Sequence, residues 1–126
     1  MNLSRRQVIV WLAAGNLIPR TITGFAHAQE AKRRIIDVRI ENGRVVAPKG
    51  AVRVSQNDVV ELRWTTDKQV RLHLHGYDRK LEIHPGMLAK MIVKLRVAGR
   101  FPITSHGWGA KGHGHDALTY LEVYPR

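Results

Sequence analysis

The residues with the clearest metal-binding chemistry lie in the segment 99–116. Three of the chain's seven histidines, His106, His113 and His115, fall within ten residues of this segment, and Asp116 follows them directly. Imidazole nitrogen and carboxylate oxygen are ligands that suit copper, zinc or nickel. The glycines between positions 107 and 114 let the backbone bend these side chains towards one point. The segment therefore predicts a metal site, with a solvated polar loop as the alternative.

A second pair of histidines, His73 and His75, lies upstream and alternates with two leucines. In a strand, this alternation puts the leucines on the core face and both histidines on the opposite face. The pair is then either exposed and without function, or one member is turned inward by a bulge at the strand end. We favour His75 as the ligand because Gly76 follows it, and keep His73 in reserve. Asp78 is placed to orient an imidazole as a hydrogen-bond acceptor.

Other reactive constellations are scarce. The chain has no cysteine, which excludes disulfides and thiolate chemistry. Ser105 and His106 could suggest a nucleophile and a base, but adjacent strand residues point to opposite faces and no acyl-transfer motif surrounds them. Trp108, between two glycines, is either a lid over the metal loop or an exposed docking residue. These patterns favour a binding protein over an enzyme.

Residues 1–28 have the pattern of an export signal. Arg5 and Arg6 precede the apolar run 8–14, and Ala26 and Ala28 are small residues at the positions that a signal peptidase reads. The paired arginines resemble the twin-arginine route, and the general secretory route is the alternative. An uncleaved anchor is disfavoured because the uncharged run is well short of the ~20 residues that span a bilayer. We expect a periplasmic or secreted protein without a stable transmembrane segment after cleavage.

Residues 29–34 form a basic linker, and residues 35–126 are expected to form one domain. The formal net charge of the whole chain is +11. Such a charge attracts anionic partners, and an acidic protein surface is the partner we expect. Nucleic acid is disfavoured because the chain is expected to be exported. Many of the basic residues occupy alternate strand positions, so a solvated sheet face is the other reading of the charge.

From residue 35 onward, apolar and polar residues alternate with period two, which is typical of half-buried strands. Val60, Leu62 and Trp64 show the pattern, and a long strand of this kind is expected over 91–97. No segment of the domain has a helical period over ten or more residues. About eight short strands separated by turn residues predict an all-β, antiparallel Greek-key sandwich.

The order of these segments resembles the cupredoxins, particularly small periplasmic members. The resemblance rests on the segments 40–43, 57–64, 85–86 and 99–103, and the 73–76 string His-Leu-His-Gly is similar to a copper-ligating motif of multicopper oxidases. It implies a cupredoxin-like sandwich with a metal site between an upstream histidine and the 99–116 segment. It also implies that Ser105 stands where the family has its cysteine ligand. A blue copper site is therefore excluded, because a cysteine thiolate defines it.

The sequence thus leads to a ranked set of hypotheses. The first is an exported cupredoxin-like protein that binds copper, as Cu²⁺ with zinc as the alternative, for copper handling or delivery. Its ligands would be His75, His106, His113 and His115, with His73 and Asp116 in reserve. The second hypothesis is a metal-free cupredoxin fold that acts as an interaction module through its basic face. The third is a small metal-dependent oxidase or hydrolase.

Overall fold

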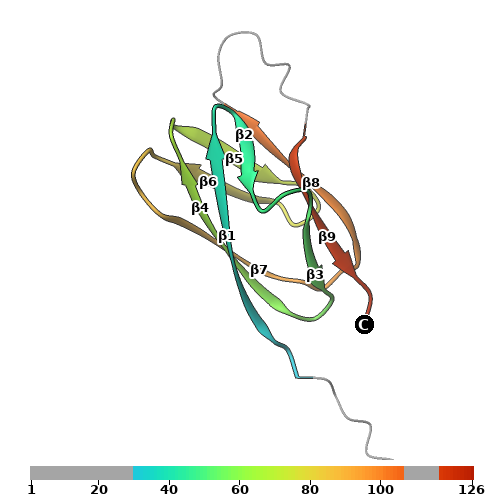
Figure 1. The fold of residues 1–126 in the computed structure, drawn as a ribbon. Coiled ribbons are helices and arrows are strands. Elements are labelled where there is room, and N and C mark those ends of the chain that lie inside the picture. Colours follow the sequence, from blue (N-terminus) through green and yellow to red (C-terminus); the bar gives the residue numbers. More distant parts are fainter. Residues whose placement is uncertain (1–29, 107–116) are drawn as a thin grey trace, which may run out of the picture.

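The computed structural model describes residues 30–106 and 117–126, and every regular element in this part of the chain is a β-strand (Figure 1). The nine strands described there are β1 Arg33–Glu41, β2 Arg44–Ala47, β3 Val52–Ser55, β4 Val59–Thr66, β5 Val70–Leu74, β6 Arg79–Ile83, β7 Ala89–Lys94, β8 Gly99–His106 and β9 Ala117–Tyr124. The prediction of an all-β domain is confirmed. In the same described residues, no helix is long and apolar enough to cross a membrane.

The strands form two sheets that pack face to face (Figure 1). A four-stranded sheet has the order β2-β1-β4-β7, and a five-stranded sheet has the order β3-β9-β8-β5-β6. The sheets are mixed, whereas the sequence pattern predicted antiparallel pairing throughout: β1 pairs with β4, and β3 with β9, in parallel. The segment 48–51 carries the chain from β2 in one sheet to β3 in the other, and the two strands run in the same direction (Figure 1).

The core fills the space between the sheets. Alternate residues of the central strands are fully buried, among them Leu62 and Trp64 of β4, Leu72 and Leu74 of β5, and Ile103 of β8. These are the positions that the period-two pattern predicts. Each large apolar side chain contributes about 1.5–3 kcal/mol by leaving water, so the two inner faces hold the sandwich together.

One predicted strand is shorter than the sequence pattern indicated. The strand expected over 91–97 ends at Lys94 as part of β7. Leu95 is still fully buried, but it exchanges backbone hydrogen bonds with the turn between β3 and β4: its N–H donates to the carbonyl of Asp58, and its carbonyl accepts from Asn57. The alternation of apolar residues therefore extends one position past the end of β7. The sequence cannot distinguish a buried residue in a strand from a buried residue in the turn that follows it.

Candidate metal centre

His73 of the upstream histidine pair and His106, the first histidine of the segment 99–116, lie on neighbouring strands of the five-stranded sheet and line one hollow on its outer face. Strands β5 and β8 are antiparallel neighbours in which Arg71 faces His106 and His73 faces Thr104. The leucines that alternate with these β5 residues are fully buried, so Arg71 and His73 lie on the opposite, outer face. The leucine alternation predicted that His73 faces away from the core, and this is confirmed.

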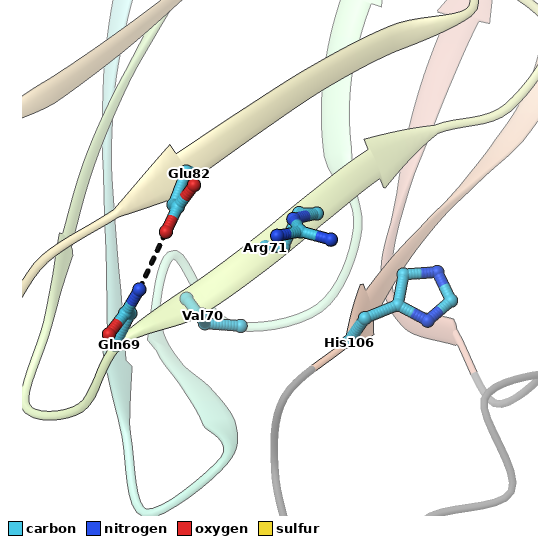
Figure 2. Close-up of a pocket in the computed structure, with 5 residues that line it drawn as sticks. All are labelled: Gln69, Val70, Arg71, Glu82 and His106. Atoms are coloured by element: carbon cyan, nitrogen blue, oxygen red, sulfur yellow. Dashed lines mark hydrogen bonds between the residues drawn. The ribbon is translucent and has the colours of Figure 1, made fainter.

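Two shallow hollows adjoin each other on this face, and His106 lines both. The first, of about 370 Å³, is lined by Arg71, Leu72, His73, Lys80 and His106. The second, of about 340 Å³, is lined by Gln69, Val70, Arg71, Glu82 and His106, and Figure 2 shows Arg71 and His106 on neighbouring strands beside it. His73, from the upstream cluster, therefore lines the same hollow as His106, the last residue of β8 and the first histidine of the histidine-rich segment.

His73 and His75 form a packed pair of imidazoles. Their ring centroids are 4.1 Å apart and the ring planes are inclined by 42°. Nε2 of His73 lies 3.0 Å from Oδ1 of Asp78, and Nε2 of His75 lies 3.0 Å from the hydroxyl oxygen of Thr104. When the Asp78 carboxylate accepts the Nε2 hydrogen of His73, Nδ1 of that ring keeps a lone pair that a metal ion can use. Asp78 thus contacts an imidazole in the way that the sequence analysis anticipated.

His75 lies on the outer side with His73 and is not turned into the core. Its N–H donates to the carbonyl of Pro102 at 3.0 Å, which extends the pairing with β8 by one residue past the end of β5. This hydrogen bond keeps the strand alternation intact through His75. The change of direction occurs only at Gly76, whose φ is +84°. The bulge that we expected to turn His75 inward is therefore absent at this position.

Ser105 and His106 point in opposite directions, as the sequence analysis expected. Ser105 is half-buried and faces Leu72, whose side chain is in the core, whereas His106 is exposed. A hydroxyl at the core side cannot share a reacting atom with an imidazole on the outer face. The arrangement gives no nucleophile and base pair here.

Several predicted site residues lie outside the described residues, namely His113, His115, Asp116 and Trp108. Within residues 30–106 and 117–126, no group of three or more histidine, aspartate or glutamate side chains is arranged to hold a metal ion. The described residues contribute one imidazole from β8 and two from β5 and the residue after it. The remaining predicted ligands belong to the segment that begins at Gly107.

Sequence reasoning missed three residues of this face: Arg71, Lys80 and Thr104. Arg71 shares the alternation of the β5 histidines, so the sequence pattern already placed it with them. Lys80 and Thr104 face His73 from β6 and β8 respectively. Finding them required the strand register, which the sequence alone did not provide.

The donors on this face suit copper chemically. Imidazole nitrogen is a ligand that suits both Cu²⁺ and Zn²⁺, and the divalent order of affinities places Cu²⁺ above Zn²⁺ for nitrogen ligands in general. His73 and His106 line one hollow, and an aspartate is already in place to fix the ring of His73. Two fixed positive charges, on Arg71 and Lys80, line the same hollow and oppose a bare cation there.

No protein-family model matches the chain, and no curated protein matches its sequence. Solved structures do match its fold. The chain is 21% identical to a chain of a haem-copper terminal oxidase dimer, with a TM-score of 0.55 over 79% of this chain and 68% of that chain. It is 21% identical to the blue copper oxidase from Nitrosomonas europaea, with a TM-score of 0.58 over 75% of this chain and 40% of the oxidase.

A third match is the periplasmic domain of subunit II of the cytochrome oxidase of Bradyrhizobium japonicum. The identity is 14% and the TM-score 0.52, over 73% of this chain and 83% of that domain. The protein therefore has a cupredoxin-like fold, as the sequence resemblance implied. It spans less than half the length of the multicopper oxidases that it matches, for example 31% of the one from Pseudomonas thermotolerans.

Proposed function

We propose that this chain is an exported cupredoxin-like protein that binds copper through histidines and handles or delivers copper outside the cytoplasm. The observation that carries the proposal is the shared hollow of His73 and His106 on adjacent strands. The histidine-rich segment with His113 and His115 continues directly from His106. The likeness of the fold to domains of copper oxidases supports the same reading.

The ligand set would be His106, His113 and His115 with one upstream imidazole, and Asp116 in reserve. We now place His73 ahead of His75 as the upstream ligand, because His73 lines the hollow with His106. Imidazole and carboxylate ligands without a thiolate give a tetragonal Cu²⁺ site and no intense blue absorption. Such a site stores or transfers the ion more readily than it passes electrons.

The setting of this proposal is the periplasm or the cell exterior. Residues 1–28 would direct export and be removed, residues 29–34 would link the signal to the domain, and Trp108 would pack over the metal or meet the partner. After removal of residues 1–28, which hold three of the 21 basic residues and none of the 10 acidic ones, the formal net charge would be +8, and this charge favours an acidic protein as the partner. Export is tested separately from copper binding, by sequencing the N-terminus of the protein recovered outside the cytoplasm.

A Cu²⁺ titration of metal-free protein covering residues 29–126, followed by electron paramagnetic resonance, tests the proposal. We expect one tight equivalent with several coupled nitrogens and no intense blue band. Joint replacement of His106, His113 and His115 by alanine should abolish this binding. Replacing His84, an exposed histidine that lies 3.8 Å from Glu82, should leave it unchanged. Absence of specific Cu²⁺ binding would overturn the proposal and leave the metal-free interaction module as the better account.

A further inference from the structure

Two side chains in the first hollow have no role in the proposed copper site. Arg71 on β5 and Lys80 on β6 project from the outer face of the five-stranded sheet, where Arg71 faces His106 and Lys80 faces His73. Both cations line the hollow of about 370 Å³ together with the two imidazoles. Neighbouring strands are about 4.8 Å apart, so Arg71 and His73 of the middle strand lie between Lys80 on one side and His106 on the other.

The acidic side chains nearest to this hollow, Glu82 and Asp78, form their hydrogen bonds with residues other than Arg71 and Lys80. Glu82 faces Arg71 across the β5–β6 pair, yet its carboxylate accepts a hydrogen bond from Nε2 of Gln69 at 2.6 Å (Figure 2). It also lies 3.8 Å from the ring of His84. Asp78 is bonded to His73. Within residues 30–106 and 117–126, neither Arg71 nor Lys80 forms an ion pair with either carboxylate.

Other arginines on the same sheet behave differently. Arg53 lies 3.3 Å and Arg100 lies 3.4 Å from the carboxylate of Glu122. Both cations pair with the single carboxylate of Glu122, which lies between them. Arg71 and Lys80 share a hollow and lack such a carboxylate in the described part of the chain. Among the described residues, the lining of the hollow therefore holds two cations and several N–H donors but no carboxylate, and the carboxylates of Glu82 and Asp78 lie beside it.

We propose that the hollow lined by Arg71, His73, Lys80 and His106 binds a small oxyanion with two or more negative charges, such as phosphate or a tricarboxylate. The guanidinium of Arg71 offers two parallel N–H donors to two oxygens, and the ammonium of Lys80 supplies a second charge-assisted bond. His106 can donate a ring N–H to a third oxygen. The proposal does not rest on copper binding, since it needs only the metal-free protein.

The test is a titration of the metal-free protein at fixed ionic strength with inorganic phosphate in one arm and citrate in the other. Backbone amide resonances of ¹⁵N-labelled protein report the site. We expect saturable shifts confined to residues of β5, β6 and β8, with a dissociation constant of about 1 mM or tighter for at least one anion. The arm that binds more tightly identifies the chemistry of the ligand.

Variants locate the site. The double variant Arg71→Gln and Lys80→Gln should weaken binding at least tenfold. The double variant Lys49→Gln and Arg53→Gln removes the same charge from exposed positions elsewhere and should change it less than twofold. Thermal unfolding gives a second readout: the anion should raise the Tm of the parent and the control but not of the Arg71 and Lys80 variant. Equal weakening in both variants, or non-saturable shifts at all basic residues, would overturn the proposal.

Discussion

Glu61 shows how strongly a single residue of this fold depends on its neighbours. It lies on the outer face of β4, yet its side chain is only 2% exposed. Arg33 donates a hydrogen bond to its carboxylate, Arg63 donates another at 2.9 Å, and Nζ of Lys90 lies 3.8 Å away. The hydrogen bond from Arg33, together with that from Arg63, lowers the pKa of Glu61 from 4.5 to about 2. The ionised form of this carboxyl group is therefore favoured by the fold.

This shift predicts how stability depends on pH. Because the pKa of Glu61 is lower in the folded than in the unfolded state, its contribution to stability is complete above pH 4.5. The contribution is lost progressively as the pH falls from about 4.5 to about 2. In urea unfolding at a series of pH values, Glu61→Gln should lower stability at pH 7 and flatten the decline across this range. Arg33→Gln should give an intermediate slope, and a slope unchanged by Glu61→Gln would contradict the assignment.

The histidine pair of β5 gives a second prediction at the scale of residues, which rests on the proposed copper site. Because His73 lines the hollow with His106 and His75 does not, His73→Ala should lower the affinity for Cu²⁺ at least about tenfold. His75→Ala should have a smaller effect. Competition with a chelator of known affinity measures both. The reverse order would show that His75 is the upstream ligand, as the sequence alone had favoured.

For single residues, the sequence predicted which face of the sheet a side chain lies on better than it predicted which residues of other strands lie next to it. Alternation with leucines correctly placed His73 on the outer face, because it depends only on the geometry of one strand, whereas the expected inward turn of His75 was wrong. The neighbours of those histidines are set by the register between strands. That register placed Lys80 opposite His73, and nothing within either segment specifies it.

At the scale of elements, the connection after β5 is fixed by a close contact between Gly76 and Phe101. Gly76 has a φ of +84°, and a Cβ at this position would lie 2.4 Å from Cδ1 of Phe101. The rings of Tyr77 and Phe101 pack edge to face with their centroids 4.8 Å apart, and the Tyr77 hydroxyl forms hydrogen bonds with the backbone of Val97. The sequence marked Gly76 as a place where the strand could bend. It could not show that a ring from β8 occupies the space beside the glycine.

Gly76→Ala should therefore destabilise the protein by about 2–5 kcal/mol, from the left-handed backbone and the clash with Phe101 together. Gly86 is a matched control: its φ is +77° and nothing lies within 4 Å of an added Cβ. Gly86→Ala should cost only the backbone term, about 1–2 kcal/mol. Equilibrium urea unfolding measures the difference. If Phe101→Leu recovers none of the excess cost in the Gly76 variant, the clash is not its cause.

The whole molecule shows where sequence patterns stop being informative. Period-two segments predicted most strands and their core faces, since burial acts on each strand separately. The division of strands between the two sheets, and the parallel pairs β1–β4 and β3–β9, depend on which edges meet once all strands have formed. The candidate site has the same limit, because its three strands come from different parts of the chain.

Asp58 contacts three segments that are far apart in the sequence. It is fully buried in the turn between β3 and β4, and one carboxylate oxygen accepts a hydrogen bond from the N–H of Lys32, just before β1, at 3.1 Å. Arg126, after β9, lies 2.9 Å from the same oxygen, and Arg34 lies 3.5 Å from the other. A single carboxylate thus connects the segment before β1, the β3–β4 turn and the residues after β9. Both sheets meet at this point.

Asp58→Ala should lower the free energy of unfolding by about 3 kcal/mol, because it leaves the N–H of Lys32 without its acceptor and removes the counter-charge of Arg126. Asp67→Ala is the control: Asp67 also accepts a backbone N–H, from Asn42 at 2.9 Å, but in an exposed turn, where the loss should be about 1 kcal/mol or less. Amide hydrogen exchange should show faster opening of β1 and β9 together in the Asp58 variant. Faster exchange in only one of these strands would mean that the carboxylate does not couple the two sheets.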